Sequence, residues 1–350
     1  MPLEEPSWWY QTPPAGLAEL LRPLGTAYGF LARARFDLRT PYRARLPVIC
    51  IGNFTAGGTG KTPLVIHICE RLQGAGHRPV ALTRGYGGRR SAHWVDASAD
   101  AARDVGDEPL LIARSAPTRI GRDRVAGARA IEAGPHRASV IIMDDGLQNP
   151  TLAKTLTIAV VDGARGIGNG RVIPAGPLRA PLEFQLGVTD AIVVTETAGG
   201  ASSVADWLRR RFAGPVLRAR LKPTARTDWL ARARIVAWAG IAAPQRFFAM
   251  LEEQGAEIAE RVAFRDHYRL RQADALQLLE LAQRRAATLV TTAKDAVRLG
   301  RERGALKELA DASRILAVAL EIIGSDNERL MALLDAALAA PAHAASGRPG

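Results

Sequence analysis

The sequence predicts an α/β fold, a mainly parallel sheet covered by helices with a second, smaller α/β lobe. Three observations support this prediction. Short apolar runs typical of buried strands recur along the chain and alternate with helical patterns. One of these runs leads into a glycine-rich loop and then into a helix. The chain has 350 residues, and chains longer than about 250–300 residues tend to split into more than one unit.

Composition and charge limit the possible classes of protein. Hydrophobic residues make up 47% and charged residues 23%, which excludes a wholly disordered or fibrous chain. Two cysteines, Cys50 and Cys69, are too few for a disulfide-stapled secreted fold or a four-cysteine zinc site. The net charge of +12 leaves nucleic acid, anionic lipid and phosphorylated substrates open as partners. Only five of the 47 basic residues are lysines, so the excess charge could also reflect a GC-rich genome, and the positions of the arginines matter more than their number.

Residues 1–46 predict a helical segment that associates with a membrane surface. Charges and a proline interrupt the apolar stretch 15–34, so it fails the requirement of about 20 apolar residues for a spanning helix. Leucines at helical spacing, the aromatic run 8–10 and the arginines between 33 and 45 favour an interfacial helix. The residues alone leave an alternative open, an amphipathic helix packed on the protein with its arginines in water. We expect no secretory signal, because the first residues carry Glu4 and Glu5 and no basic region.

The first buried strand and the loop after it predict a nucleotide site. Residues 47–51 read as a strand, residues 52–62 as the loop Gly-Asn-Phe-Thr-Ala-Gly-Gly-Thr-Gly-Lys-Thr, and residues 64–72 as a helix. This is the P-loop arrangement, in which backbone N–H groups wrap phosphates, Lys61 reaches the β- and γ-phosphates and Thr62 holds Mg²⁺. The predicted nucleotide-binding residues are Asn53, Thr55, Ala56, Gly57, Gly58, Thr59, Gly60, Lys61 and Thr62. Thr55 stands where the usual pattern has glycine.

A second metal anchor is predicted at the end of the apolar run 139–143. Asp144 and Asp145 follow this run, and a carboxylate at the end of a buried strand can bind Mg²⁺ directly or through water. An ordinary Asp-Gly turn is the alternative, and the P-loop favours the metal site. The sequence therefore predicts ATP and Mg²⁺ as cofactors.

Among nucleotide-binding classes, the residues favour a kinase. The run Thr292-Ala293-Lys294-Asp295 approaches a guanine-binding motif, but its lysine and aspartate are adjacent, so the spacing is wrong for a GTPase. A kinase needs a group that accepts or orients the acceptor hydroxyl. Asp107 and Glu108 open an apolar helix after the strand 78–83, although acidic residues at this place also serve as ordinary helix caps.

The chain resembles the tetraacyldisaccharide 4′-kinases, the lipid A 4′-kinases of Gram-negative bacteria. The matching blocks run in order to about residue 300: 52–63, 83–86, 105–109, 144–148, 168–171, 174–179, 266–267 and 292–297. The resemblance implies that ATP phosphorylates the 4′-hydroxyl of a tetraacyldisaccharide 1-phosphate in lipid A biosynthesis. It also implies an enzyme at the cytoplasmic face of the inner membrane, peripheral or monotopic.

The resemblance also implies roles for individual residues. Asp107 would be the base, His267 its partner and Lys61 the third catalytic residue. Thr62, Asp144 and Asp145 would hold or orient Mg²⁺, with Gln148 nearby. Phosphates of ATP or of the lipid would be met by arginines, namely Arg84, Arg124, Arg171 and Arg179.

Three of the matching blocks depart from the pattern of this family. Leu147 and Asn149 flank Gln148, Ala180 replaces a glutamate, and Ala293 replaces another. Glu183 could take over the role of the glutamate missing at position 180. None of the departures touches Lys61 or Asp107, so we expect an active enzyme.

The expected organisation is a membrane-associating segment 1–46, a P-loop core 47–227, a smaller α/β lobe 228–335 and a disordered tail 336–350. In the smaller lobe we expect strands at 235–239, 289–292 and 315–320 and a helix at 244–254. The site would span a cleft between the lobes, whose closure assembles the dyad of Asp107 and His267. We expect a monomer.

Two other functions remain open. A soluble small-molecule kinase would need no lipid surface. A nucleic-acid-binding ATPase would want a basic patch interleaved with aromatic residues, and aromatic residues make up only 5% of this chain. We therefore expect no nucleic-acid partner.

Overall fold

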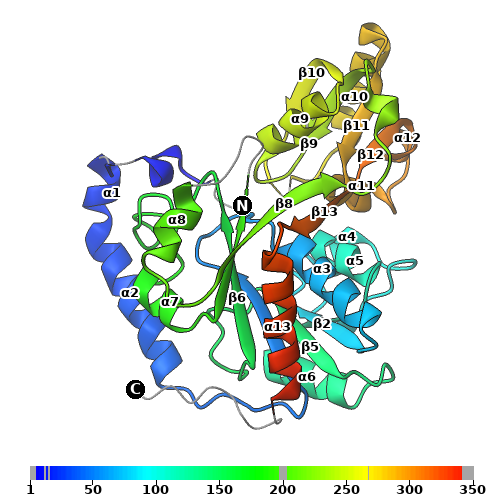
Figure 1. Cartoon of the computed structure of the whole chain (residues 1–350). Coiled ribbons are helices and arrows are strands. Elements are labelled where there is room, and N and C mark those ends of the chain that lie inside the picture. Colours follow the sequence, from blue (N-terminus) through cyan, green and yellow to red (C-terminus); the bar gives the residue numbers. More distant parts are fainter. Residues whose placement is uncertain (1–4, 12, 15, 197–202, 267, 341–350) are drawn as a thin grey trace.

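The computed structural model describes residues 5–11, 13–14, 16–196, 203–266 and 268–340. Among these residues, one nine-stranded sheet forms a large lobe and one four-stranded sheet forms a small lobe (Figure 1). The fold class predicted from the sequence is confirmed, since most strand pairs are parallel and helices cover both sheets.

The large sheet has the strand order β13-β8-β7-β6-β1-β5-β2-β4-β3. Its strands are β1 (Val48–Asn53), β2 (Pro79–Thr83), β3 (Ala92–Trp94), β4 (Thr118–Gly121), β5 (Val140–Asp144), β6 (Leu156–Asp162), β7 (Ala191–Thr195), β8 (Val216–Pro223) and β13 (Val318–Ile322). Only the pairs β3–β4 and β13–β8 at the two edges are antiparallel among the described strands of this sheet. The central strands β1, β5 and β6 are buried along their whole length because helices cover both of their faces.

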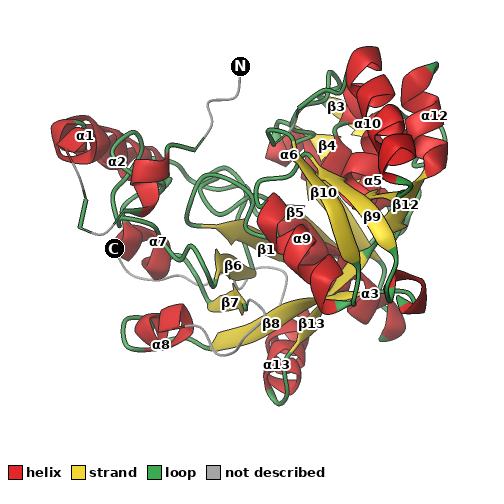
Figure 2. Ribbon diagram, turned by 90° about the horizontal axis from the view of Figure 1, so that it is seen from above, coloured by secondary structure: helices red, strands yellow, loops and turns green. Residues whose placement is uncertain are grey.

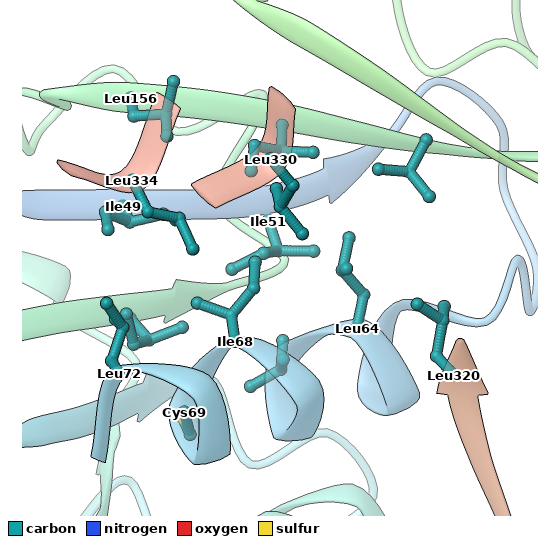
Figure 3. Close-up of a cluster of buried hydrophobic side chains, with 14 of the residues drawn as sticks. Ile49, Ile51, Leu64, Ile68, Cys69, Leu72, Leu156, Leu320, Leu330 and Leu334 are labelled. Atoms are coloured by element: carbon teal, nitrogen blue, oxygen red, sulfur yellow. The ribbon is translucent and has the colours of Figure 1, made fainter. Parts of the chain in front are cut away.

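Helices pack on both faces of the large sheet. They are α3 (Lys61–Gly74), α4 (Ala102–Val105), α5 (Asp107–Ala113), α6 (Arg124–Glu132), α7 (Leu182–Gly187), α8 (Ser203–Arg209) and α13 (Asp326–Ala339). Figure 3 shows Leu64, Ile68 and Leu72 of α3 and Leu330 and Leu334 of α13 meeting the strands in one buried cluster. Each of these side chains contributes about 1.5–3 kcal/mol on burial. This core holds the end of β1, and with it the glycine-rich loop, in a fixed place.

The small lobe is a parallel sheet of order β10-β9-β11-β12 between two layers of helices (Figure 2). Its strands are β9 (Arg234–Ala239), β10 (Glu257–Ala263), β11 (Thr288–Thr292) and β12 (Ser313–Leu316), and its helices are η2 (Asp228–Leu230), α9 (Pro244–Glu253), α10 (Gln272–Arg285), α11 (Ala293–Leu299) and α12 (Ala305–Ala312). Phe247 and Phe248 of α9 pack on one face of this sheet, and Leu278 of α10 packs on the other.

The small lobe occupies less of the chain than the predicted range 228–335. The run 315–320, which we expected to form one strand, splits at Ala317 between two sheets. Leu316 ends β12 in the small sheet, and β13 then pairs with the edge strand β8 of the large sheet. The apolar face of α13 packs on the large sheet too, and α13 continues to Ala339, past the predicted start of a tail at residue 336. Residues 341–350 of the predicted tail lie outside the described residues.

The N-terminal segment lies along the outside of the large lobe (Figure 1). It forms η1 (Ser7–Tyr10), α1 (Gly16–Leu20) and α2 (Arg22–Asp37). Gly25 and Gly29 bring α2 close to the loop 163–181, since a Cβ at Gly25 would lie 2.6 Å from the Val172 carbonyl oxygen. The other faces of α2 expose large apolar side chains, including Leu24 and Phe30. Within the described part of the chain, no helix combines the length and the apolar character needed to cross a membrane.

Candidate functional site

The glycine-rich loop joins β1 to α3 and is braced from two sides. Gly57 and Gly60 adopt positive φ angles of 92° and 84°, which only glycine adopts without strain. The Asn53 side-chain amide donates to the backbone oxygens of Thr55 (2.7 Å) and Gly57 (3.3 Å) and so shapes the turn. The Ala56 backbone N–H donates to Pro177 O at 2.7 Å. Asn53, Thr55 and Ala56, all predicted to bind nucleotide, thus set the shape of the loop.

The remaining residues of the loop face a large cavity of about 2200 Å³. Gly57, Gly58, Thr59, Gly60, Lys61 and Thr62 line one part of it, and residues of the small lobe and of α2 line others. The Lys61 ammonium donates to Asn53 Oδ1 at 3.1 Å and lies 3.4 Å from Asp145 Oδ1. The loop is therefore built as a phosphate cradle with its lysine held in place by an amide and a carboxylate.

Asp144 and Asp145, at the end of β5, are adjacent carboxyl groups with opposite pKa shifts. Burial by itself raises the pKa of Asp145, but the charges of Lys61 and Arg179 hold it well below the usual range. Burial, together with the charges of Glu108 and Asp145, raises the pKa of Asp144 to about 7. Its Oδ2 accepts a hydrogen bond from the Thr83 hydroxyl at 3.1 Å, whereas its buried Oδ1 has no partner among the described residues. A buried carboxylate oxygen left without a partner is a candidate ligand for a cation.

Gln148, the fourth predicted metal residue, lines the cavity next to this pair. Its side-chain nitrogen donates to the Asn53 backbone oxygen at 2.8 Å and to Gln185 Oε1 at 2.7 Å. These two bonds fix the amide group at the end of β1 and leave its oxygen as the group able to face a cation.

Asp107, the predicted base, begins α5 and is buried in an ionic network between the lobes. The Arg298 guanidinium of α11 donates from Nε to Asp107 Oδ2 at 2.7 Å, and its Nη1 donates to Asp295 Oδ1 at 2.9 Å. Lys294 Nζ, one turn earlier on α11, lies 3.4 Å from Glu108 Oε1 and 3.5 Å from Asp266 Oδ1. We call these residues, 107–108, 266, 294–295 and 298, the bridging network. Asp107 itself does not line the large cavity, whereas its neighbour Glu108 does.

The bridging network contains two cations, and the sequence analysis did not predict that they pair with acids of the other lobe. Lys294 and Arg298 are four residues apart on α11, so they share one helix face, and an acidic helix start at 107–108 lies opposite. That charge complementarity was the signal available in the sequence. His267 lies outside the described residues, so its predicted pairing with Asp107 stays a prediction.

Three of the four predicted phosphate-binding arginines bind groups of the protein itself in this structure. Arg124 is buried and donates to the backbone oxygens of Gly121 and Asp144. Arg179 donates to Asp145 at 2.9 Å, and Arg171 pairs with Glu19 of α1. Arg84 differs from these three, because it is exposed, lines the cavity and has no side-chain partner among the described residues.

Ala180 and Glu183, the suggested substitute for the glutamate missing at position 180, lie in different surroundings. Ala180 is buried and lines the cavity, in the place where the family pattern has a glutamate. Glu183 is exposed in the first turn of α7 and is not among the residues that line the cavity. The geometry therefore gives no support to Glu183 as a substitute.

Comparison with known proteins decides the family. Residues 17–339 match the family described as LpxK, tetraacyldisaccharide-1-P 4′-kinase. The chain belongs to this family of 4′-kinases. The resemblance predicted from the sequence is confirmed, and the chain is a kinase.

Similar 4′-kinases cover nearly the whole chain. A tetraacyldisaccharide 4′-kinase of Methylorubrum extorquens (strain PA1) is 48% identical over 309 residues, which are 88% of this kinase and 93% of the relative. The protein of the same name from Rhodopseudomonas palustris (strain BisB5) is 43% identical over 334 residues, 95% and 96% of the two chains. The crystal structure of LpxK from Aquifex aeolicus in complex with ATP shares the fold of this kinase, with a TM-score of 0.70 and 22% identity over 92% of this chain and 100% of that one.

Proposed function

We propose that this kinase transfers the γ-phosphate of ATP to the 4′-hydroxyl of a tetraacyldisaccharide 1-phosphate, a step of lipid A biosynthesis. One observation carries the proposal. A single cavity joins the phosphate cradle around Lys61 to Tyr28 and Leu31, exposed apolar side chains of α2. A kinase for a soluble metabolite has no need of an exposed apolar helix beside its phosphate loop, whereas a kinase for an acylated sugar does.

The chain offers a site that fits Mg²⁺. Mg²⁺ prefers hard oxygen ligands and is usually held by one or two carboxylates together with water and substrate phosphates. Asp144, with its unpartnered Oδ1, and the ionised Asp145 provide the carboxylates, and Thr62 and Gln148 provide neutral oxygens. When bound there, Mg²⁺ would neutralise charge on the transferred phosphate. Lys61 would then exchange its contact with Asp145 for the phosphates.

Asp107 is our candidate for the group that accepts the proton of the hydroxyl. A carboxylate paired with a guanidinium is a poor base, so Arg298 has to release Asp107 Oδ2 before the transfer. Arg298 belongs to α11 of the small lobe and Asp107 to α5 of the large lobe, so a movement between the lobes would control this contact. His267 would orient the released carboxylate.

We also propose that the kinase works as a monomer attached to the cytoplasmic face of the inner membrane. The exposed apolar side chains of α1 and α2 would enter the headgroup region, and Arg43 and Arg45 would meet anionic lipids. α2 packs on the protein through Gly25 and Gly29 and still presents these side chains outward. Packing on the protein and contact with a membrane are thus compatible.

The experiment that tests this function measures transfer of radiolabelled γ-phosphate to tetraacyldisaccharide 1-phosphate in detergent micelles. The intact kinase should label the lipid, and Lys61→Ala should not. A kinase that binds ATP but leaves the lipid unlabelled would favour the alternative of a soluble acceptor. Steep salt-dependent binding to DNA or RNA would favour a nucleic-acid-binding ATPase.

A further inference from the structure

One face of α2 lines the large cavity, and the side chains on this face change from apolar to basic along the helix. Tyr28, Leu31, Ala32, Arg35 and Phe36 line this cavity, and Arg39 lines a smaller pocket beside it. Residues three and four apart lie on one face of a helix, so these side chains form a continuous stripe. The stripe begins with exposed apolar side chains and ends with two arginines. It therefore fits a ligand that has an apolar part and an anionic end.

The smaller pocket, of about 370 Å³, is strongly basic. Four arginines, Arg35, Arg39, Arg122 and Arg124, line it, and Asp123 is its one acidic residue among those described. Asp123 is already engaged, because its Oδ1 caps α6 by accepting from the backbone N–H groups of residues 125 (2.9 Å) and 126 (3.1 Å).

Three of these arginines have no acidic partner among the described residues. Arg122 donates from Nη2 to the Gly88 backbone oxygen at 2.8 Å, and neither Arg35 nor Arg39 forms an ion pair within the described part of the chain. The cations beside the glycine-rich loop differ, because Lys61 and Arg179 both pair with Asp145. Several guanidinium groups gathered without an opposite charge attract an anion.

Arg124 places this pocket close to the reacting end of the cavity. Its buried guanidinium donates to the Asp144 backbone oxygen at 2.7 Å. Arg122 lies two residues earlier in the chain, so its Cα is within about 7 Å of that of Arg124. An anion bound by Arg35, Arg39 and Arg122 would thus lie near Asp144 and Asp145 without touching them. A disaccharide requires such a separation, because its 1-phosphate and its 4′-hydroxyl are at opposite ends.

We propose that Arg35, Arg39 and Arg122 bind the phosphate monoester that the acceptor lipid carries at its 1-position. The inference rests on the proposed function, which makes a tetraacyldisaccharide 1-phosphate the acceptor. A phosphate monoester is a compact anion with several acceptor oxygens, and guanidinium groups bind such oxygens in pairs. The apolar part of the stripe, at Tyr28 and Leu31, then faces the acyl chains of the same molecule.

The test compares two acceptors in detergent micelles, the tetraacyldisaccharide 1-phosphate and the same lipid without its 1-phosphate. The intact kinase should use the phosphorylated lipid with a higher kcat/KM. Arg35→Gln/Arg39→Gln and Arg122→Gln should each raise KM for this lipid about 10–100-fold through the loss of charged hydrogen bonds, with kcat little changed. On the phosphate-free lipid the same variants should match the intact kinase. Arg33→Gln is the control, because Arg33 lies on the same helix, pairs with Asp37 at 3.5 Å and lines neither cavity.

The outcomes separate this site from the proposed function. An intact kinase that labels both lipids with equal kcat/KM, or variants that lose activity equally on both, would overturn the phosphate site alone. An intact kinase that labels neither lipid would overturn the proposed function and the site with it. Flotation with anionic vesicles should not distinguish Arg35→Gln/Arg39→Gln from Arg33→Gln; a selective loss in the double variant would assign the arginines to bilayer headgroups and overturn the proposal.

Discussion

Arg298 is buried between two carboxylates, so its replacement by methionine should destabilise the whole chain. Only 12% of its side chain is exposed, and it contacts Asp107 (5% exposed) and Asp295 (0% exposed). Burial raises the pKa of Asp295, and the positive charge of Arg298 opposes that rise. Methionine fills a similar volume without charge, and it would leave two buried carboxylates without their guanidinium.

The size of this effect follows from the burial. Removing one partner of a buried ion pair costs about 3–5 kcal/mol. Unfolding entropy is about 2.1 cal/mol/K per residue, or about 0.7 kcal/mol/K for a chain of 350 residues. Arg298→Met should therefore lower Tm by about 4–7 °C.

Thermal unfolding followed by circular dichroism measures this shift. Arg301→Gln provides the control, because Arg301 is exposed three residues further along the chain and should shift Tm very little. The double variant Asp107→Asn/Arg298→Met should recover part of the lost stability, since one unpaired charge is removed. A Tm for Arg298→Met equal to that of Arg301→Gln would refute the reasoning, because the network would then contribute no net stability.

Three further changes test other parts of the structure. Asp107→Ala should lower kcat about 10²–10⁴-fold with nucleotide binding unchanged; near-normal turnover would remove Asp107 as the base. Burial raises the pKa of Asp144 to about 7, so between the ordinary aspartate pKa of about 4 and pH 7 the folded kinase holds a proton that the unfolded chain has lost. Its Tm should therefore fall relative to Asp144→Asn as the pH rises from about 4 to 7 and level off above 7; parallel curves would contradict this. Leu24→Ser should weaken flotation with vesicles, and Leu276→Ser, equally exposed on α10, should not; equal flotation would count against α2 as the membrane contact.

Local patterns predicted most of the fold. The strands at 235–239 and 289–292 and the loop ending at Lys61 could be predicted because their signals, apolar runs and a glycine-rich turn, lie within a few residues. The split at Ala317 was not readable, since an apolar run of this length says nothing about which of two sheets each half joins.

The candidate site was predictable to a lesser degree. Lys61, Asp144 and Asp145 were predicted in one place, and the structure brings them together at the carboxyl ends of two neighbouring parallel strands. The network around Arg298 depends on a contact between residues almost two hundred positions apart, which no local pattern reveals. The part that Ala56 plays in shaping the loop could not be predicted either, because its backbone N–H donates to the carbonyl oxygen of Pro177, which is far away in the sequence.

The return of the chain from the small lobe to β13 has a consequence during synthesis. β8 is made before the small lobe, and its neighbour β13 follows about 100 residues later, so at 5–20 residues per second the edge of β8 stays uncovered for roughly 5–20 s. A bare strand edge invites pairing with other nascent chains. The second half of β8 carries Arg220 and Lys222, and charged side chains on an edge strand disfavour such pairing. Once β13 has been made, its Glu321 pairs with both residues, at 2.5 and 2.6 Å. The same two charges thus oppose pairing with other chains during synthesis and form ion pairs between β8 and β13 in the finished sheet.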